Sequence, residues 1–285
     1  DKSTINQIVT RLNQEADDDV SLRVEQLPNS KEIIEIFGRG DLHIGILLEK
    51  MRREGFEMTV SPPKVLFQED GTGKKLEPIE EVTVDLDEEH SSKVIDSMNR
   101  RKGQMIELKD TGKNKKRIIF HAPTRGLMGY TSRFLTLTKG NGVINRIFHS
   151  FGKYTGDLDG RRNGALISMA SGKAVAFAIF NLQARGEMFV THNDPVYEGM
   201  IVGLAPKAGD MIINVMKGKQ LTNMRTQGTD ENVVLTPVRQ MSIAEQLSML
   251  NTDEALEITP KSLRLRKAIL NPNDRKKNEK SSTPL

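Results

Sequence analysis

The sequence predicts an α+β fold: two ferredoxin-like (split βαβ) domains followed by a mostly β C-terminal domain with a long basic loop. Three observations support this prediction. Two successive stretches order their helical and extended patterns as split βαβ units. The chain beyond them is dominated by short apolar runs, and a long basic stretch separates two of those runs. We expect domains at residues 1–78, 79–154 and 155–285, the last ending in a disordered basic tail.

The first predicted domain has the element order α, β, β, α, β. Apolar residues at positions 5, 8, 9 and 12 share one helical face, with Ser3 as the predicted N-cap. A hairpin turning at 28–30 follows, and then a helix from Leu42 to Glu54 with Asp41 as N-cap and Gly55 as terminator. A strand over 56–68, interrupted at Pro62 and Pro63, completes the unit. Because this order lacks the opening strand of a split βαβ unit, we expect that strand upstream of Asp1, in a longer protein.

The second predicted domain has the order β, α, β, β, α, β. A strand over 80–86 leads into a helix beginning at Asp87, which carries acids in its first turn and bases in its last, as the helix dipole favours. A hairpin around Asp110 to Gly112, one helix after Pro123 and a strand over 143–148 follow.

In the third domain, strands are predicted at 165–169, 174–180, 200–204, 211–216 and 233–238, with a helix at 242–250.

Composition describes a well-charged globular protein with basic faces. Charged residues make up 28%, mean hydropathy is −0.46 and the net charge is +4. Residues 77–89 hold seven acids and no base, whereas residues 100–117 and 261–280 each hold eight bases against two acids. This segregation favours a polyanionic partner over three unrelated solvated faces. There is no cysteine, no secretory signal pattern and no apolar run long enough to span a bilayer, so we expect a cytoplasmic protein without a membrane partner.

The stretch from Lys217 to Glu231 is the first candidate site. It lies between two strand-like apolar runs and is much longer than a hairpin turn needs, so it is either a solvated loop or a surface for a partner. Its cations, amides and hydroxyls suit a phosphate and ribose backbone. The predicted RNA-binding residues are Lys217, Lys219, Thr222, Asn223 and Arg225.

A second basic group, Lys113, Lys115 and Lys116, is predicted at the tip of the hairpin in the second domain. It is either a polar hairpin or a further RNA contact. Aromatic residues make up 5% of the chain and tryptophan is absent, which disfavours a protein that stacks single-stranded bases on its rings.

No catalytic, nucleotide or metal site is predicted within this chain. The glycine that a phosphate-binding loop requires five residues before Gly-Lys is missing at every Gly-Lys pair. The five histidines show no spacing of three or four residues, so local sequence assembles no metal site. His192, near Asp194, is the strongest hint of an enzyme, and a stand-alone enzyme with a site there remains an alternative, as does a protein–protein adaptor.

Several motifs carry a family resemblance. The run from Gly38 to Ile44 and that from Ser61 to Val65 resemble the third domain of translational GTPases of the elongation factor G type. Further runs narrow this resemblance to one subfamily, BipA, also called TypA. They are Pro123 to Leu127, Asn163 to Ser168, Gly172 to Phe177, Val196 to Gly199 and Leu221 to Arg225. Asp41 departs from the family's common Glu, a conservative change.

The resemblance implies a bacterial ribosome-binding GTPase that acts in stress adaptation and large-subunit biogenesis. It implies that domain 79–154 corresponds to the fifth domain of elongation factor G, and that the family's basic loop, which approaches the acceptor arm of A-site tRNA, matches Lys217 to Asp230. Ribosomal RNA near the stalk base is the other implied partner. GTP and Mg²⁺ would bind a domain outside this chain. The chain itself would hold no cofactor, would not hydrolyse GTP and would be a monomer.

Overall fold

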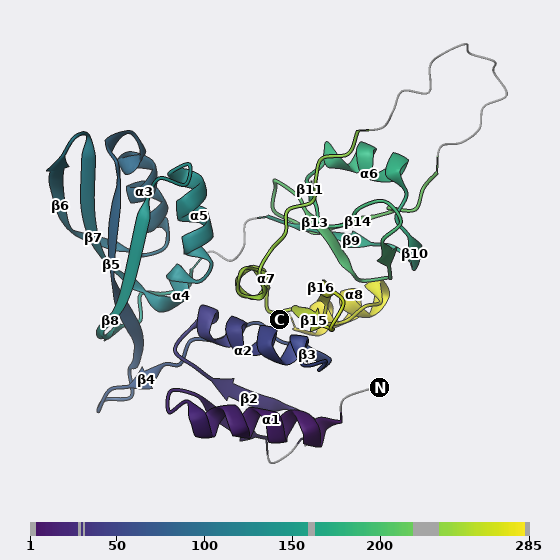
Figure 1. The fold of residues 1–285 in the computed structure, drawn as a ribbon, viewed down its shortest axis with the longest axis horizontal. Helices are drawn as coiled ribbons and strands as arrows, with labels where there is room; N and C mark the ends of the chain where they lie inside the picture. The colour runs from purple at the N-terminus through teal and green to yellow at the C-terminus, as the bar shows by residue number, and fades with distance from the viewer. Residues whose placement is uncertain (1–3, 28–29, 31, 159–162, 219–233, 283–285) are drawn as a thin grey trace, which may run out of the picture. The chain divides into compact units, whose positions relative to one another are not determined.

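The structure, a computed structural model, describes residues 4–27, 30, 32–158, 163–218 and 234–282. The predicted α+β class is confirmed (Figure 1). Residues 63–160 form one compact unit, and residues 1–62 and 161–285 form the other. The domain boundaries predicted at 78/79 and 154/155 stay a prediction. Within the described residues, no helix combines the length and apolar character needed to cross a membrane.

The unit of residues 63–160 is a sheet with helices on one face. Figure 1 shows the helices α3, α4 and α5 beside the sheet. The antiparallel strand order β8-β5-β7-β6 is that of a split βαβ fold, as predicted, with β4 added beside β5. Its elements are β4 (Gln68–Glu69), β5 (Lys75–Asp87), α3 (Glu88–Arg100), β6 (Gln104–Gly112), β7 (Lys115–Pro123), α4 (Thr124–Leu127), α5 (Tyr130–Leu137) and β8 (Val143–Lys153).

Two local predictions for this unit were wrong. The single helix expected after Pro123 is two, because Gly129 adopts a left-handed conformation (φ 65°) that interrupts the helical path between α4 and α5. The hairpin turns at Lys113 and Asn114 rather than at Asp110 to Gly112. Both turn residues have positive φ (53° and 58°), as a two-residue type I′ turn requires.

The other unit begins with the predicted order α, β, β, α, β. Its first elements are α1 (Ile5–Asp18), β1 (Arg23–Gln26), β2 (Ile34–Phe37), α2 (Asp41–Arg53) and β3 (Met58–Val60). Both predicted N-caps were wrong. The cap of α1 is Thr4, whose Oγ1 accepts from Gln7 N while Gln7 Oε1 accepts from Thr4 N, and the cap of α2 is Gly40. Asp41 instead lies in the first turn of α2, where its charge favours the helix dipole.

Residues 161–285 add two small sheets to this unit, together with two strands that pair with β3 in a third sheet. The sheets have the orders β11-β13-β9-β14, β10-β12 and β16-β15-β3. The elements are β9 (Ala165–Ser168), β10 (Gly172–Lys173), α6 (Ala176–Gln183), β11 (Glu187–Met188), β12 (Pro195–Val196), β13 (Ile201–Leu204), β14 (Met211–Ile213), α7 (Ile243–Met249), β15 (Glu254–Ile258), β16 (Leu263–Lys267) and α8 (Pro272–Ser282).

Three predictions for this region were wrong. The strand expected over 174–180 is mostly the helix α6, because a continuous apolar run fits a buried helix as well as a buried strand. The described part of the strand expected over 233–238 is irregular. The expected disordered tail contains α8, and the strands β15 and β16 were not anticipated.

The pairing of β3 with β15 joins the two ends of the chain in one sheet. Thr59 lies opposite Glu257 in this antiparallel register. Leu48 of α2 belongs to the same buried cluster as Leu247 of α7 and Leu256 of β15. Helix α2 and the C-terminal strands therefore share a hydrophobic core, and α2 is fixed against α7.

Candidate functional site

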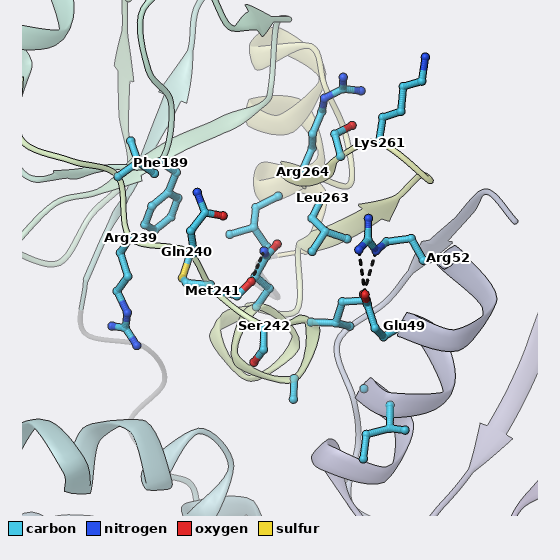
Figure 2. A pocket seen from close by; sticks show the side chains of 18 of the residues that line it. Glu49, Arg52, Phe189, Arg239, Gln240, Met241, Ser242, Lys261, Leu263 and Arg264 are labelled. Carbon is cyan, nitrogen blue, oxygen red and sulfur yellow. Dashed lines mark hydrogen bonds and ion pairs between the residues drawn. The ribbon is translucent and has the colours of Figure 1, made fainter. Parts of the chain in front are cut away.

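A groove of about 820 Å³ lies between α2 and α7, and we call it the α2–α7 groove (Figure 2). One wall is α2, the opposite wall is the irregular segment 238–242 with the start of α7, and the turn between β15 and β16 lies at its end. Buried side chains at its base, including Ile201, Ile243 and Leu265, belong to the shared core. Its position therefore depends on the β3–β15 sheet beneath it.

Close packing of two helices sets the width of the groove. A Cβ at Gly45 of α2 would lie 2.9 Å from the Cβ of Ala244 in α7, so glycine is what permits this approach. Helix α7 starts at a capping box in which Ser242 Oγ accepts from Glu245 N (3.2 Å) and Glu245 Oε2 accepts from Ser242 N (3.1 Å). These two features place the 238–242 segment against α2.

The ionisable side chains that line the groove are predominantly basic. Among the lining residues that the structure describes, a single acid, Glu49, stands against six bases. Such an excess favours an anionic partner, because a low-dielectric concave wall strengthens the field of its charges. The six bases are Lys50, Arg52, Arg53, Arg239, Lys261 and Arg264.

Two of the bases are held by the one acid. Arg52 and Arg53 both bind Glu49 at 2.8 Å, and the hydrogen bonds from Arg52 lower the pKa of Glu49 to about 2 against the opposing effect of burial. Arg52 Nη1 also donates to Pro260 O at 2.8 Å, which ties α2 to the β15–β16 turn. Arg52 thus has a structural role in addition to its charge.

Lys261 and Arg264 are the bases best placed to receive a ligand. Lys50 is engaged by Glu15 (2.6 Å) and Arg239 by Glu245 (2.7 Å), whereas neither Lys261 nor Arg264 forms an ion pair with another described residue. Figure 2 shows Lys261 and Arg264 extending from the turn and from β16, with Arg239 across the groove from them. Two cations on one wall suit successive phosphates of a nucleic-acid backbone.

The groove lacks the parts of a catalytic site. Among the described residues that line it there is no histidine, the one carboxylate is held by two arginines, and the two serines are Ser242, which caps α7, and Ser262 of the tight β15–β16 turn. No nucleophile therefore stands beside a base there. The exposed side chains of Leu42 and Ile46 add apolar area along α2. The groove therefore combines basic side chains with exposed apolar area.

The predicted basic loop falls mostly outside the described residues: Lys219, Thr222, Asn223 and Arg225 all do. Lys217 is described and exposed, just after β14. It lines a smaller hollow of about 410 Å³ together with Arg185 and residues of α6. The assignment of these five residues to RNA stays a prediction.

The lysines of the β6–β7 hairpin differ in their surroundings. Lys113 and Lys115 are exposed at the turn and the first residue of β7. Lys116 is half-buried, with its Nζ 2.5 Å from Glu88 Oε1. An ion pair already engages Lys116, so Lys113 and Lys115 are the stronger candidates for an RNA contact, which stays a prediction.

Local structure accounts for the residues near His192. His192 Nδ1 accepts from Ala176 N (3.2 Å) in the first turn of α6, and Asp194 Oδ2 accepts from Thr191 N (2.7 Å). Both side chains thus satisfy backbone donors of a helix start and a turn, as capping residues do. These contacts give the pair a structural role.

Sequence reasoning missed the α2–α7 groove. Its residues come from positions 42–53, 189–201, 238–246 and 261–265, which the β3–β15 pairing brings together. The basic run 261–280 was the one available signal, and it pointed to Lys261 and Arg264 without showing their neighbours.

Two family models together match residues 74–272 of the chain. Residues 163–272 match the TypA/BipA C-terminal domain, and residues 74–162 match the elongation factor G C-terminus. The chain is 44% identical over 275 residues to a protein of Salmonella typhimurium, and 45% over 275 residues to one of Bacillus subtilis, each named large ribosomal subunit assembly factor BipA. Each alignment covers 96% of this chain. The chain belongs to the BipA/TypA family.

A BipA-named protein of Haemophilus influenzae is 42% identical over 281 residues, which cover 98% of this chain. The chain spans 45% of the length of each of these three relatives. The predicted family is therefore confirmed. Within this BipA/TypA chain, the 238–246 and 261–265 segments of the groove lie inside the matched C-terminal domain, whereas α2 precedes both matched ranges.

Proposed function

We propose that this chain is the ribosome-docking part of a translational GTPase, which binds ribosomal RNA and the acceptor arm of A-site tRNA. The observation that carries the proposal is the similarity, over 96–98% of the chain, to proteins named large ribosomal subunit assembly factor. We propose that it acts in the cytoplasm as a monomer, in stress adaptation and large-subunit assembly. GTP and Mg²⁺ would bind the remaining length of the relatives, and the residues here would not hydrolyse GTP.

The α2–α7 groove supports a phosphate-backbone contact within this proposal. Lys261 and Arg264 offer cations that no other described residue neutralises, on a wall fixed by Arg52 and the shared core. The loop from Lys217 to Glu231 is proposed to reach the tRNA, and the hairpin with Lys113 and Lys115 to contact ribosomal RNA near the stalk base. We propose the three-domain division 1–78, 79–154 and 155–285 as the arrangement that presents these surfaces.

The salt dependence of ribosome binding tests this proposal. The chain is sedimented with purified large ribosomal subunits over a series of salt concentrations. Neutralising about six phosphates makes log affinity fall against log salt with a slope of roughly −4 to −5. A flat response would contradict RNA docking and favour the protein–protein adaptor.

Charge-neutralising variants then test the groove itself. Lys261→Gln with Arg264→Gln is expected to reduce the magnitude of the salt slope by about 2, because each phosphate contact contributes about 1. Lys64→Gln with Lys74→Gln, two exposed lysines elsewhere, removes the same charge and should leave the slope nearly unchanged. Equal slopes in both double variants would exclude the groove as a phosphate site.

The loop is tested separately. Lys217→Ala, Lys219→Ala and Arg225→Ala together should weaken binding to ribosomes that carry A-site tRNA and leave the melting temperature unchanged, since lysine and arginine side chains seldom belong to a hydrophobic core. Binding equal to that of the unmodified chain would remove the loop from the proposal. Hydrolysis of GTP by this chain alone would contradict its non-catalytic assignment.

A further inference from the structure

Strand pairing in the 63–160 unit brings together two histidines and a glutamate that lie far apart in the sequence. Glu81 lies on β5 directly opposite His121 on β7. Oε2 of Glu81 is 3.6 Å from Nε2 of His121. The ring of His149, on β8, lies 4.1 Å from the ring of His121 between centroids, with 30° between their planes.

A β-bulge delivers the third of these side chains. The register of β8 against β5 shifts where Ser150 pairs with Ile79 and Phe148 pairs with Glu80, so His149 is the extra, unpaired residue. A bulge re-aims the side chain that it carries, and bulges occur often beside functional sites. Strands β7 and β8 both pair with β5, and the bulge in β8 places His149 beside His121 of β7.

We propose that Glu81, His121 and His149 bind a divalent transition-metal ion of the Zn²⁺ class. One ligand atom from each of the three lies within 4.8 Å of the other two. Two ligands of a tetrahedral Zn²⁺ ion, at 2.0–2.1 Å from the metal, stand about 3.3 Å apart. The 3.6 Å between Glu81 and His121 is already near this value, and His149 offers a ring nitrogen within 4.8 Å of both.

The donor types define which ions fit. Two imidazole nitrogens and one carboxylate oxygen suit Zn²⁺, Ni²⁺, Cu²⁺ or Co²⁺, whereas Mg²⁺ and Ca²⁺ prefer oxygen ligands. Three protein ligands leave a coordination position for water or for an external donor. Side-chain exposure of 33% for Glu81 and 26% for His121, with His149 exposed, leaves that position open to solvent.

The alternative is that no metal binds, and that His121 only pairs with Glu81 and stacks on His149. Isothermal titration of the full, untagged chain with Zn²⁺ separates the two. One ion per chain is expected, with affinities for other ions rising from Co²⁺ through Ni²⁺ to Cu²⁺. Bound Co²⁺ should give a visible absorption band of a nitrogen and oxygen site, because the chain has no cysteine. Absence of Zn²⁺ binding up to about 1 mM would overturn the proposal.

Variants assign the binding to these residues. His149→Ala should weaken Zn²⁺ binding at least about tenfold, since even the loss of an outer-shell partner commonly costs that much. His149 is exposed, so the variant should fold, and far-UV circular dichroism checks this. Glu81→Gln should weaken binding as well. His192→Ala removes a histidine of the other unit and should leave the affinity unchanged. Equal affinities in His149→Ala and the unmodified chain would overturn the proposal.

Discussion

Replacing Lys267 by methionine is expected to destabilise the unit that carries the α2–α7 groove. Lys267 lies on β16 and is 1% exposed, yet its ammonium group meets three carboxylates. Nζ lies 2.5 Å from Asp210, 2.7 Å from Asp253 and 3.1 Å from Glu254. Methionine keeps most of the side-chain volume, so the substitution removes the charge and leaves the packing nearly intact.

The exposure of the three acids sets the size of the effect. Removing one partner of a buried ion pair typically costs 3–5 kcal/mol, because the remaining charge stays buried. The side chains of Asp210 and Asp253 are 35% and 58% exposed and can regain water, whereas that of Glu254 is 0% exposed. We therefore expect the lower end, about 3 kcal/mol of unfolding free energy.

Urea unfolding followed by far-UV circular dichroism measures this loss. Lys261→Met, at an exposed position, is the control and should change stability by less than about 0.5 kcal/mol. Adding Glu254→Gln to Lys267→Met should restore part of the loss, since it removes the stranded charge. A Lys267→Met chain as stable as the control would refute the assignment of this cluster as a buried, charge-dependent element.

The same lysine predicts an alkaline pH dependence. Burial disfavours its charged form, but hydrogen bonds to Asp210 and Asp253 outweigh burial and raise the pKa of Lys267. A group whose pKa is higher in the folded state stabilises the fold fully below its unfolded pKa, and that contribution is lost as pH rises through the folded value. The stability difference between the unmodified chain and Lys267→Met should therefore shrink above the ordinary pKa of lysine.

Three smaller predictions concern the groove and its surroundings. Gly45→Val should lower the free energy of unfolding by about 1–3 kcal/mol, because its side chain overlaps Ala244; a melting temperature equal to that of the unmodified chain would contradict this contact. Glu49→Gln should cost about 1 kcal/mol near neutral pH. Since the pKa of Glu49 is lowered to about 2, its contribution to the free energy of unfolding is present above the ordinary glutamate pKa and fades towards pH 2. A stability difference between the unmodified chain and Glu49→Gln that stays constant with pH would argue against the Arg52 pair as the source of this contribution. His192→Ala should cost up to about 1 kcal/mol and speed hydrogen exchange at the start of α6, while ribosome binding stays unchanged; loss of that binding would point to a direct role for His192.

Elements with a clear period were predictable from sequence. The alternation of Val82, Val84 and Leu86 correctly placed β5, and all three are buried beneath the helices. The apolar positions of α1 and α2 correctly placed both helices. The family resemblance rested on longer runs and was confirmed by the matches to 74–162 and 163–272. Local periodicity and glycine placement were enough to predict these helices and strands, because only one face of each is buried.

The predictions that were wrong, and the sites that were missed, concern segments whose structure depends on residues far away in the chain. The run from Ala174 to Phe180 is apolar throughout, so no period distinguished α6 from a strand. The two candidate sites depend on strand register: β3 with β15 for the groove, and β5 with β7 and β8 for Glu81 and the two histidines. A search for histidines at helical spacing could not find a cluster that a sheet and a bulge assemble.

The pairing of β3 with β15 also has a consequence for synthesis of the chain. Roughly 200 residues separate the two strands, so a ribosome adding about 5–20 residues per second makes β15 about 10–40 s after β3. Throughout that interval the edge of β3 awaits its native partner, and an open edge can pair with a neighbouring nascent chain. Strand β3 is three residues long and is followed by Pro62 and Pro63, which lack amide hydrogens. This short, proline-ended edge offers few groups for mispairing while the C-terminal strands are still being made.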